Sequence, residues 1–257
     1  MLNNQHRVSM RRGMKPLKGQ HRIRTFPVHA VASNSLVKRQ MLTEEEMIAR
    51  AREFVETGSG YFTAPRPELF SEDFVFRGPV IGPLNKRDYL ISLDSFQMYN
   101  AFPDLNSNAF GFCLDPLEPG RIRFFVRQTG THKGPLNLVD GFGSYEPTFR
   151  KANVGPEAYS MMLNEEGRVK LLNVGYPVDF DAPNTTANKY GAAFGLLQSV
   201  GISLPTGPAF GVVQKLTNGL KEFGIGSSAR SVSKWEEIPQ WYKEFCPRRE
   251  GAEGVSF

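Results

Sequence analysis

The chain is poor in the residues that usually build metal centres and disulfide frameworks. Its 257 residues include two cysteines, Cys113 and Cys246, which lie far apart and in no paired motif. This spacing excludes a disulfide framework and a zinc knuckle. Three of the four histidines lie in the first 29 residues, so only His132 remains in the body of the chain. With no Gly-rich phosphate loop followed by Lys-Ser or Lys-Thr either, we expect no metal and no cofactor.

Long hydrophobic runs are also missing. The longest candidate, Gly191–Gly201, falls short of the about 18 residues that a membrane-spanning helix needs. A spanning helix is therefore not expected. An alternative is peripheral contact with a membrane surface through the amphipathic stretch 191–223 of the C-terminal part.

Acidic residues are absent from the first 43 positions, which carry nine Lys or Arg. An acid-free, Arg-rich segment without a long apolar run is typical of an organelle transit peptide. We predict such a peptide at 1–32 and a linker at 33–42, because Val28–Ala32 resembles the small-residue processing sites of plastid precursors. The predicted location is the chloroplast, with the mitochondrion as the alternative. A disordered basic tail that binds RNA or anionic lipid is the other interpretation.

The basic pI of about 9.2 depends on that N-terminal segment. Removing its nine basic residues from the total of 31 leaves 22, against 26 acidic residues. The body of the chain is therefore mildly acidic, which argues against binding to a phosphate backbone. We expect no nucleic-acid partner.

The folded part is predicted to begin at Thr43, which forms a capping box with Glu46 ahead of a helix that ends near Gly58. A short strand follows at 73–77, and apolar residues at helical spacing predict a second helix that ends near Ala101. Further strands are predicted at 107–115, 120–132, 142–150, 157–163 and 168–178. Helix, strand, helix and then an antiparallel sheet indicate an α+β fold.

The composition changes after position 181. Turn signals separate amphipathic segments, one of them at 206–223 with Thr206 as its cap. Ser233 and Glu236 predict a second capping box before an aromatic segment. We therefore divide the chain into a main domain at 43–180 and a C-terminal helical extension at 181–257.

Two motifs frame the middle of the chain. Phe102-Pro103-Asp104 follows a predicted helix, and an alternating strand runs into the turn Gly130-Thr131-His132-Lys133-Gly134. In this order the elements resemble the SnoaL-like branch of the nuclear transport factor 2-like superfamily, which includes polyketide cyclases and resembles ketosteroid isomerase. The resemblance implies a cone formed by a curved antiparallel sheet and N-terminal helices.

The resemblance also implies a pocket in which a carboxylate or a His moves a proton next to a ketone. At the positions implied, the chain has Ser160 on the next-to-last strand and only apolar or amide side chains from 171 to 174 on the last strand. The next carboxylate is Asp179. The Pro-Thr-Gly of the family is altered to Pro147-Thr148-Phe149. We therefore expect the architecture of a cyclase without its usual carboxylate.

Six residues remain as candidates for the site. His132 and Asp104 are the candidate catalytic residues, and either could instead have a structural role in its turn. The candidate ligand-binding residues are Arg127, Tyr159, Tyr176 and Phe125. Arg127 shares a strand face with Arg123, and acidic neighbours would make that face an ordinary solvated one.

Two classes of function fit these residues. In the first, the protein is a plastid module that binds a small apolar ligand or assists a partner, and its C-terminal helices cover the pocket. In the second, it is an isomerase, cyclase or hydrolase that acts on an apolar carbonyl compound through His132 and a tyrosine. The missing carboxylate favours the first class. A homodimer through the sheet is a further expectation.

Overall fold

The computed structural model describes residues 42–138, 144–179, 182, 184–186, 191–202 and 229–246. The predicted transit peptide at 1–32, nearly all of the linker at 33–42 and the predicted helix at 206–223 lie outside the described residues. Among the helices that are described, none has the length and apolar character needed to cross a membrane.

The elements follow one another from Glu44 to Phe245. The helices and 3-10 turns are α1 (Glu44–Thr57), η1 (Pro67–Leu69), α2 (Lys86–Phe96), α3 (Met98–Ala101), α4 (Ala192–Ser199), η2 (Trp235–Glu237) and α6 (Gln240–Phe245). The strands are β1 (Phe70–Arg77), β2 (Leu84–Asn85), β3 (Phe110–Leu114), β4 (Arg121–Val126), β5 (Thr129–Thr131), β6 (Leu136–Asn137), β7 (Ser144–Tyr145), β8 (Lys151–Asn153), β9 (Glu157–Leu163) and β10 (Val169–Pro177).

The first helix begins and ends where the sequence predicts. Thr43 Oγ1 accepts the Glu46 N–H at 3.2 Å, and the Glu46 carboxylate accepts the Thr43 N–H at 2.8 Å, which completes the capping box. At the other end, the Gly58 N–H donates to the Phe54 carbonyl at 3.1 Å. These bonds satisfy backbone groups that have no partner inside the helix.

The predicted second helix is divided in two. α2 ends at Phe96 because Gln97 adopts a left-handed backbone conformation, with φ at 35°, and α3 begins at the next residue. A non-glycine residue in this region is strained, so it interrupts the helical path. Apolar periodicity continues through the break, which is why the sequence predicts one helix.

Two predicted strands also differ from the structure. The strand expected at 120–132 is divided into β4 and β5, with Arg127 and Gln128 between them. The strand expected at 142–150 is wrong, since the described part of this segment contains only the two-residue β7. By contrast, the strand expected at 157–163 matches β9 in both bounds.

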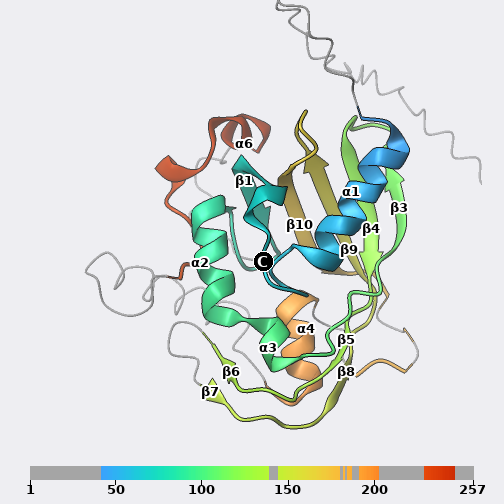
Figure 1. Cartoon of the computed structure of the whole chain (residues 1–257), viewed down its shortest axis with the longest axis vertical. Coiled ribbons are helices and arrows are strands. Elements are labelled where there is room, and N and C mark those ends of the chain that lie inside the picture. The colour runs from blue at the N-terminus through green and yellow to red at the C-terminus, as the bar shows by residue number, and fades with distance from the viewer. Residues whose placement is uncertain are drawn as a thin grey trace, which may run out of the picture. The chain divides into compact units, whose positions relative to one another are not determined.

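Six strands form the main sheet, in the order β2-β1-β10-β9-β4-β3. β1 runs parallel to β10, and every other neighbouring pair is antiparallel. Two small sheets pair β5 with β8 and β6 with β7. α1 and α2 lie over one face of the main sheet (Figure 1). The predicted α+β fold with N-terminal helices and a mainly antiparallel sheet is therefore confirmed.

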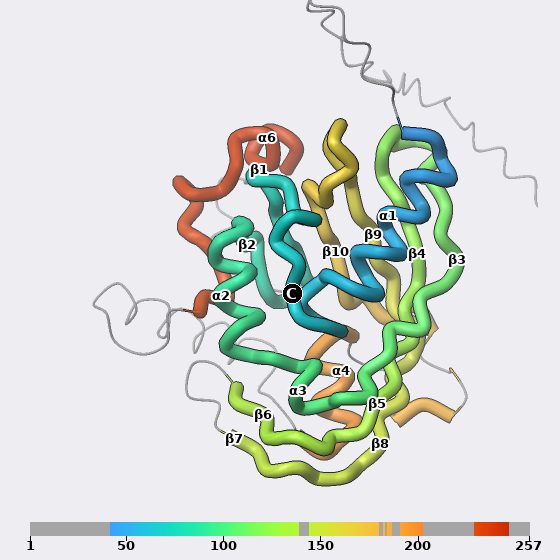
Figure 2. The backbone as a smooth tube through the Cα atoms, viewed as in Figure 1, coloured from blue at the N-terminus to red at the C-terminus, as the bar shows by residue number. Residues whose placement is uncertain are grey.

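Among the described residues, two apolar clusters lie on the covered side of the sheet and around α4, and a third lies under the C-terminal residues. The inner-sheet cluster joins α1 and α2 to the covered face of the sheet, and its members include Phe54, Phe70, Phe74, Ile122, Phe124, Val126, Tyr159 and Met161. The α4 cluster joins α3, β6, β8 and α4, and its members include Met98, Phe102, Leu136, Val154, Leu196, Leu197 and Val200. α4 lies against β8 and against β10 of the main sheet (Figure 2). Although α4 follows position 181, it packs as part of the core.

The C-terminal strap, residues 229–246, covers part of the opposite face of the sheet. Ile238 is 2% exposed and packs with Val75 and Leu171, which lie side by side on β1 and β10. The Trp241 indole N–H donates to a backbone carbonyl of β1 at 2.9 Å. The strap therefore shields apolar side chains that would otherwise face solvent.

The start of the strap corrects one prediction. Ser233 does not form a capping box with Glu236: its Oγ donates to Asp88 Oδ2 at 2.5 Å and accepts the Asn85 N–H at 3.0 Å. The next turn, η2, has no side-chain cap. The local pattern is misleading because the hydroxyl binds residues on α2 and at its N-cap, far away in the sequence.

Shortening Ile238 to Ala tests the contribution of the strap to stability. We expect the free energy of unfolding to fall by about 2–4 kcal/mol, because the change removes buried methyl groups and leaves a cavity against β1 and β10. Urea denaturation measures the effect, with the exposed Glu236→Ala as the control, which should change stability by no more than about 0.5 kcal/mol. If Ile238→Ala and Glu236→Ala both changed the free energy of unfolding by the same small amount, the strap would be only loosely attached.

Candidate functional site

Two carboxylates of the described residues are buried, those of Asp88 and Glu157, and Glu157 is the more deeply buried. Glu157, the first residue of β9, is 0% exposed. Its side chain shares the inner face of the sheet with Tyr159 and Met161, because alternate residues of a strand point to the same side. A buried carboxylate is costly unless hydrogen bonds hold it.

Two donors hold the Glu157 carboxylate. The Ala192 N–H, at the start of α4, donates to Oε2 at 2.5 Å, and the Gln128 side-chain amide donates to Oε1. Within the described residues, no salt bridge reaches Glu157. Burial raises the pKa of Glu157 to about 7, although both hydrogen bonds favour the charged form and act to lower it.

Gln128 lies between β4 and β5 and is fully buried. Its backbone carbonyl accepts the Val154 N–H at 2.9 Å, which fixes the segment against β8. With its amide nitrogen donating to Glu157, the side-chain oxygen Oε1 is buried and has no hydrogen-bond partner among the described residues. The break between the two strands therefore places an unused acceptor beside the carboxylate.

Tyr61 adds an unused donor. It follows α1, packs against both apolar clusters, and its buried hydroxyl makes no hydrogen bond of normal geometry in the described part of the chain. Burial raises the pKa of Tyr61 well above its usual value; the charge of Glu157 and the nearby Tyr89 add to the rise, and a weak hydrogen-bonding interaction with the Gln128 side chain opposes it. The hydroxyl therefore stays protonated at neutral pH.

Tyr159 completes the group on the carboxylate's own strand. It is 6% exposed, and burial followed by the charge of Glu157 raises its pKa well above the usual value. The two tyrosines, Gln128 and Glu157 meet where the two apolar clusters adjoin. We call these four residues the Glu157 cluster.

The Glu157 cluster can do acid-base chemistry. A carboxyl group with a pKa near 7 takes up and gives back a proton close to neutral pH, which is the condition for efficient general acid-base catalysis. Two of the roughly four acceptor positions of the carboxylate are used by protein donors, so others remain. A protonated Tyr61 can stabilise negative charge that develops on a neighbouring oxygen.

His132 lies in a different environment. It is 0% exposed, its ring stacks on Phe102 at a centroid distance of 5.1 Å, and Nδ1 accepts the Thr148 N–H at 3.2 Å. That bond places the proton of the neutral ring on Nε2, which is buried without a partner among the described residues. Burial lowers the pKa of His132, and the Gly134 backbone opposes this more weakly. No hydrogen bond joins His132 to the Glu157 cluster in the described region.

Asp104 is exposed and binds the Gly-Thr-His turn. Its carboxylate accepts the Thr131 N–H at 2.7 Å and the Thr131 hydroxyl at 2.8 Å, and Lys133 Nζ lies 3.3 Å away. The two sequence motifs therefore meet in space, as their pairing in the sequence suggests. Their contact holds the chain after α3 against β5, and it does not bring Asp104 to the Glu157 cluster.

The other predicted ligand-binding residues lie on the opposite face of the sheet from Tyr159. Phe125 and Tyr176 are both opposite Ala158 in register and are 37% and 47% exposed. Arg127 lies over the Phe110 ring, 5.4 Å from its centroid. These residues form one exposed row, separated from Glu157 by the thickness of the sheet. A homodimer through this face stays a prediction.

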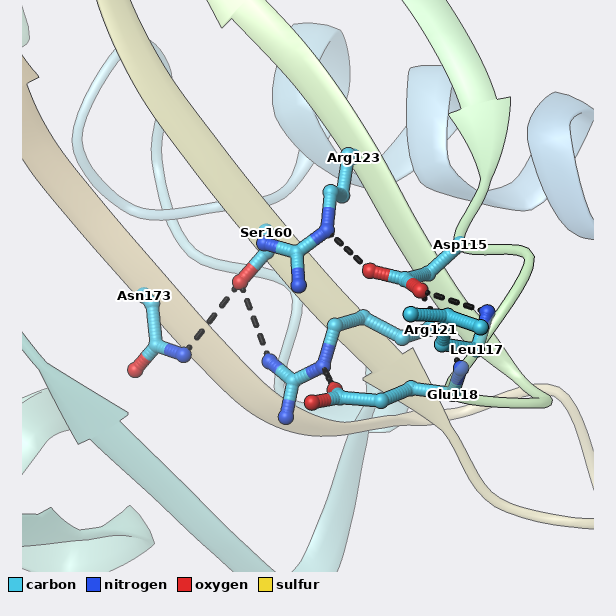
Figure 3. Close-up of polar contacts among 7 residues, drawn as sticks. All are labelled: Asp115, Leu117, Glu118, Arg121, Arg123, Ser160 and Asn173. Atoms are coloured by element: carbon cyan, nitrogen blue, oxygen red, sulfur yellow. Dashed lines mark hydrogen bonds and ion pairs between the residues drawn. The ribbon is translucent and has the colours of Figure 1, made fainter. Parts of the chain in front are cut away.

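Ser160 also lies on this outer face. Figure 3 shows its hydroxyl between two neighbouring strands: Oγ accepts from Arg121 Nη1 at 3.1 Å and from Asn173 Nδ2 at 3.3 Å. Arg123 pairs with Asp115 beside it, so the acidic partner that the sequence suggests is present, although Ser160 and Arg121 are themselves buried. The predicted inward polar position is wrong, because a shift by an odd number of residues moves a side chain to the other face.

The sequence prediction does not include Glu157. The expected spacing places the carboxylate on the last strand, where Leu172 and Val174 do face the interior but carry no charge. The available signal was an acid in phase with buried residues on β9. Among the described residues, no group of three or more His, Cys, Asp or Glu side chains is placed to hold a metal ion.

No protein-family model and no curated protein matches the chain. Solved structures of similar fold include AclR of Streptomyces galilaeus, named as a hydroxylase (18% identity, 71% of this chain and 99% of that chain, TM-score 0.44). Another is a protein of Jannaschia sp. CCS1 named as a SnoaL-like polyketide cyclase (16% identity, 55% of this chain and 90% of that chain, TM-score 0.38). A third is IdmH of Streptomyces antibioticus (18% identity, 51% of this chain and 88% of that chain, TM-score 0.36). These are similarities at low identity over part of this chain, and the SnoaL-like assignment stays a prediction from the sequence.

The Glu157→Gln variant tests the burial of the carboxylate through stability. Because the folded pKa of about 7 lies above the usual 4.5, the folded state binds more protons between these values. The stability of the wild type relative to the variant should therefore fall by about 3 kcal/mol as the pH rises from 4.5 to 7. Urea denaturation across this range measures it.

The exposed Glu56→Gln, which makes the same change on the surface of α1, is the matched control. A flat difference between Glu157→Gln and the wild type would mean that the Glu157 carboxylate titrates normally and is not a base poised near neutral pH.

Proposed function

We propose that the protein is an enzyme that moves a proton on a small apolar carbonyl compound, as an isomerase or a cyclase does. Glu157 takes the proton from the carbon next to the carbonyl group and returns it at the end of the reaction. Tyr61 donates a hydrogen bond to the carbonyl oxygen, which becomes negatively charged in between. Gln128 holds the carboxylate, and Tyr159 lines the site.

The observation that carries this proposal is a buried carboxylate with a pKa near 7 beside two buried polar atoms without partners. Each unpartnered polar atom costs about 1–3 kcal/mol. Such groups are rare in folded proteins, and a bound ligand that completes their hydrogen bonds is one explanation for them. Perturbed pKa values also cluster at functional sites.

The surroundings favour an apolar substrate. Tyr61 packs against both apolar clusters, and the described residues bring no positive charge to Glu157. An anionic substrate would meet the carboxylate without a counter-ion, which is unfavourable in a low-dielectric site. A neutral carbonyl compound matches the Tyr61 donor and the Glu157 base.

A module that only binds its ligand is the second candidate. The sequence favours it because the expected strand carries no carboxylate. Glu157 removes that reason. The unpartnered atoms of Tyr61 and Gln128 support ligand binding in either case, so the two candidates differ in turnover alone. The experiment must therefore detect proton transfer itself.

Hydrogen–deuterium exchange into small ketones provides that test. In deuterated buffer, NMR should show that the protein accelerates loss of the protons next to the carbonyl of an apolar cyclic ketone. Glu157→Gln should slow this exchange by about 100-fold or more, and Tyr61→Phe by about 10-fold or more, because they remove the base and the donor. The rate should rise with pH through about 7 as Glu157 loses its proton.

The control is Tyr176→Phe, which makes the same change on the exposed outer face and should leave exchange unchanged. Ketone binding without any exchange would support the binding module and contradict the enzyme. Loss of activity in Tyr176→Phe, with none in Tyr61→Phe, would move the site to the outer face.

We also propose that the protein acts in a plastid, on the composition of residues 1–32. N-terminal sequencing of the native protein should then find a start near residues 31 to 41. A native protein that keeps Met1 and fractionates with the cytosol would contradict this location.

A further inference from the structure

The start of α4 lacks a cap of its own. Its N-cap is Gly191, which has no side chain to accept the first backbone N–H groups. The Ala192 N–H instead donates to Glu157 Oε2 at 2.5 Å, 35 residues earlier in the sequence. Glu157 therefore does for α4 what a capping Ser or Asp does for most helices.

Two glycines make this contact close. A Cβ atom on Gly191 would lie 2.5 Å from the Gly175 carbonyl oxygen and 2.7 Å from Glu157 Oε2, so no larger residue fits there without moving α4. Gly175 itself has a φ of 85°, a conformation that other residues rarely adopt. β10 and the start of α4 therefore approach each other only because both positions are glycine.

The remainder of α4 is fixed independently. Leu196 and Leu197 are 0% exposed and Val200 is 1% exposed in the α4 cluster, against β8 and α3. This packing holds the helix axis in place and aims its first N–H group at the carboxylate. A helix N-terminus also carries a partial positive charge that favours an anion.

We propose that α4, which belongs to the C-terminal extension, is the positioning element of Glu157, and that docking of its first turn is coupled to the charge of that carboxylate. A charged carboxylate accepts the Ala192 N–H more strongly than a neutral one does. Docking of α4 therefore favours loss of the proton, and by thermodynamic reciprocity protonation loosens the first turn. In the proposed function this coupling also sets the charge of the catalytic base, and only that consequence rests on the proposed function.

Within the described part of the chain, few other groups influence this equilibrium. The titratable side chains that face Glu157 there are Tyr61, after α1, and Tyr159, on its own strand, while Tyr89 of α2 faces those two tyrosines. α4 carries no titratable side chain, and β10 brings the Gly175 backbone. Both facing tyrosines are neutral at physiological pH, so the amide donors and burial determine the protonation equilibrium of Glu157.

The Gly191→Ala variant tests the proposal directly. The backbone at this position is extended, with φ at −103° and ψ at −179°, so alanine adopts it without strain and the only conflict is the Cβ contact. We expect the displaced amide to raise the pKa of Glu157 by about one pH unit, the loss of one hydrogen bond to a charged group. Carbon-13 NMR of labelled glutamate side chains, titrated from pH 4 to 9, measures this without any substrate.

The matched control is Ser199→Ala at the other end of α4, which removes only the bond from its hydroxyl to the Gly195 carbonyl. Its Glu157 titration should match that of the wild type. An unshifted titration in Gly191→Ala, with the variant folded, would overturn the proposal. If Glu157→Gln had no effect on ketone exchange, the proposed function would fail while the titration result remained.

A second measurement uses the unmodified protein. Amide hydrogen exchange, corrected for intrinsic rates, should show weaker protection of the α4 amides, such as that of Gly195, at pH 5.5 than at pH 8.5. Amides of α2 serve as the internal reference and should not change. In Glu157→Gln the pH dependence of α4 should vanish, and equal protection at both pH values in the wild type would overturn the coupling.

Discussion

The contact of Glu157 with two amide donors is the constraint on which the site depends. It joins β9, the break between β4 and β5, and the start of α4, which lie far apart in the sequence. A charge in the interior is tolerated only when hydrogen bonds compensate for lost solvation. The positions of Gln128 and Ala192 are therefore set by the carboxylate as much as by the packing around them.

Local signals predicted the elements that depend on neighbours in sequence. The capping box of Thr43 and Glu46 defines the start of α1, and alternation defines β9 in both bounds. The failures occur where a distant contact or one strained residue overrides the pattern. Gln97 interrupts a helix whose apolar spacing continues, and Ser233 binds Asp88 instead of capping a helix. The residues that surround Gln97 and Ser233 in the sequence indicate neither the left-handed conformation nor the distant contact.

The site was less predictable than the fold. Family spacing identified the right strands but placed Ser160 inward, while the register of β9 sends it outward and Glu157 inward. Alternation alone would have shown that an acid shares a face with Tyr159. The roles of Tyr61 and Gln128 could not be read from the sequence, because each depends on a contact across at least 29 residues.

Residues 191–202 and 229–246, which the structure describes, cover parts of both faces of the sheet. The strap covers Val75 and Leu171 on the outer face, and α4 seals the end of the inner one beside Glu157. A carboxylate with a raised pKa weakens the fold at neutral pH, and unpartnered polar atoms weaken it further. Burial of apolar side chains by these C-terminal elements offsets that loss, since a few large side chains contribute a comparable free energy. The C-terminal part is therefore the structural condition for keeping an ionisable group in the core, and a division of the chain at 180 would separate the site from its support.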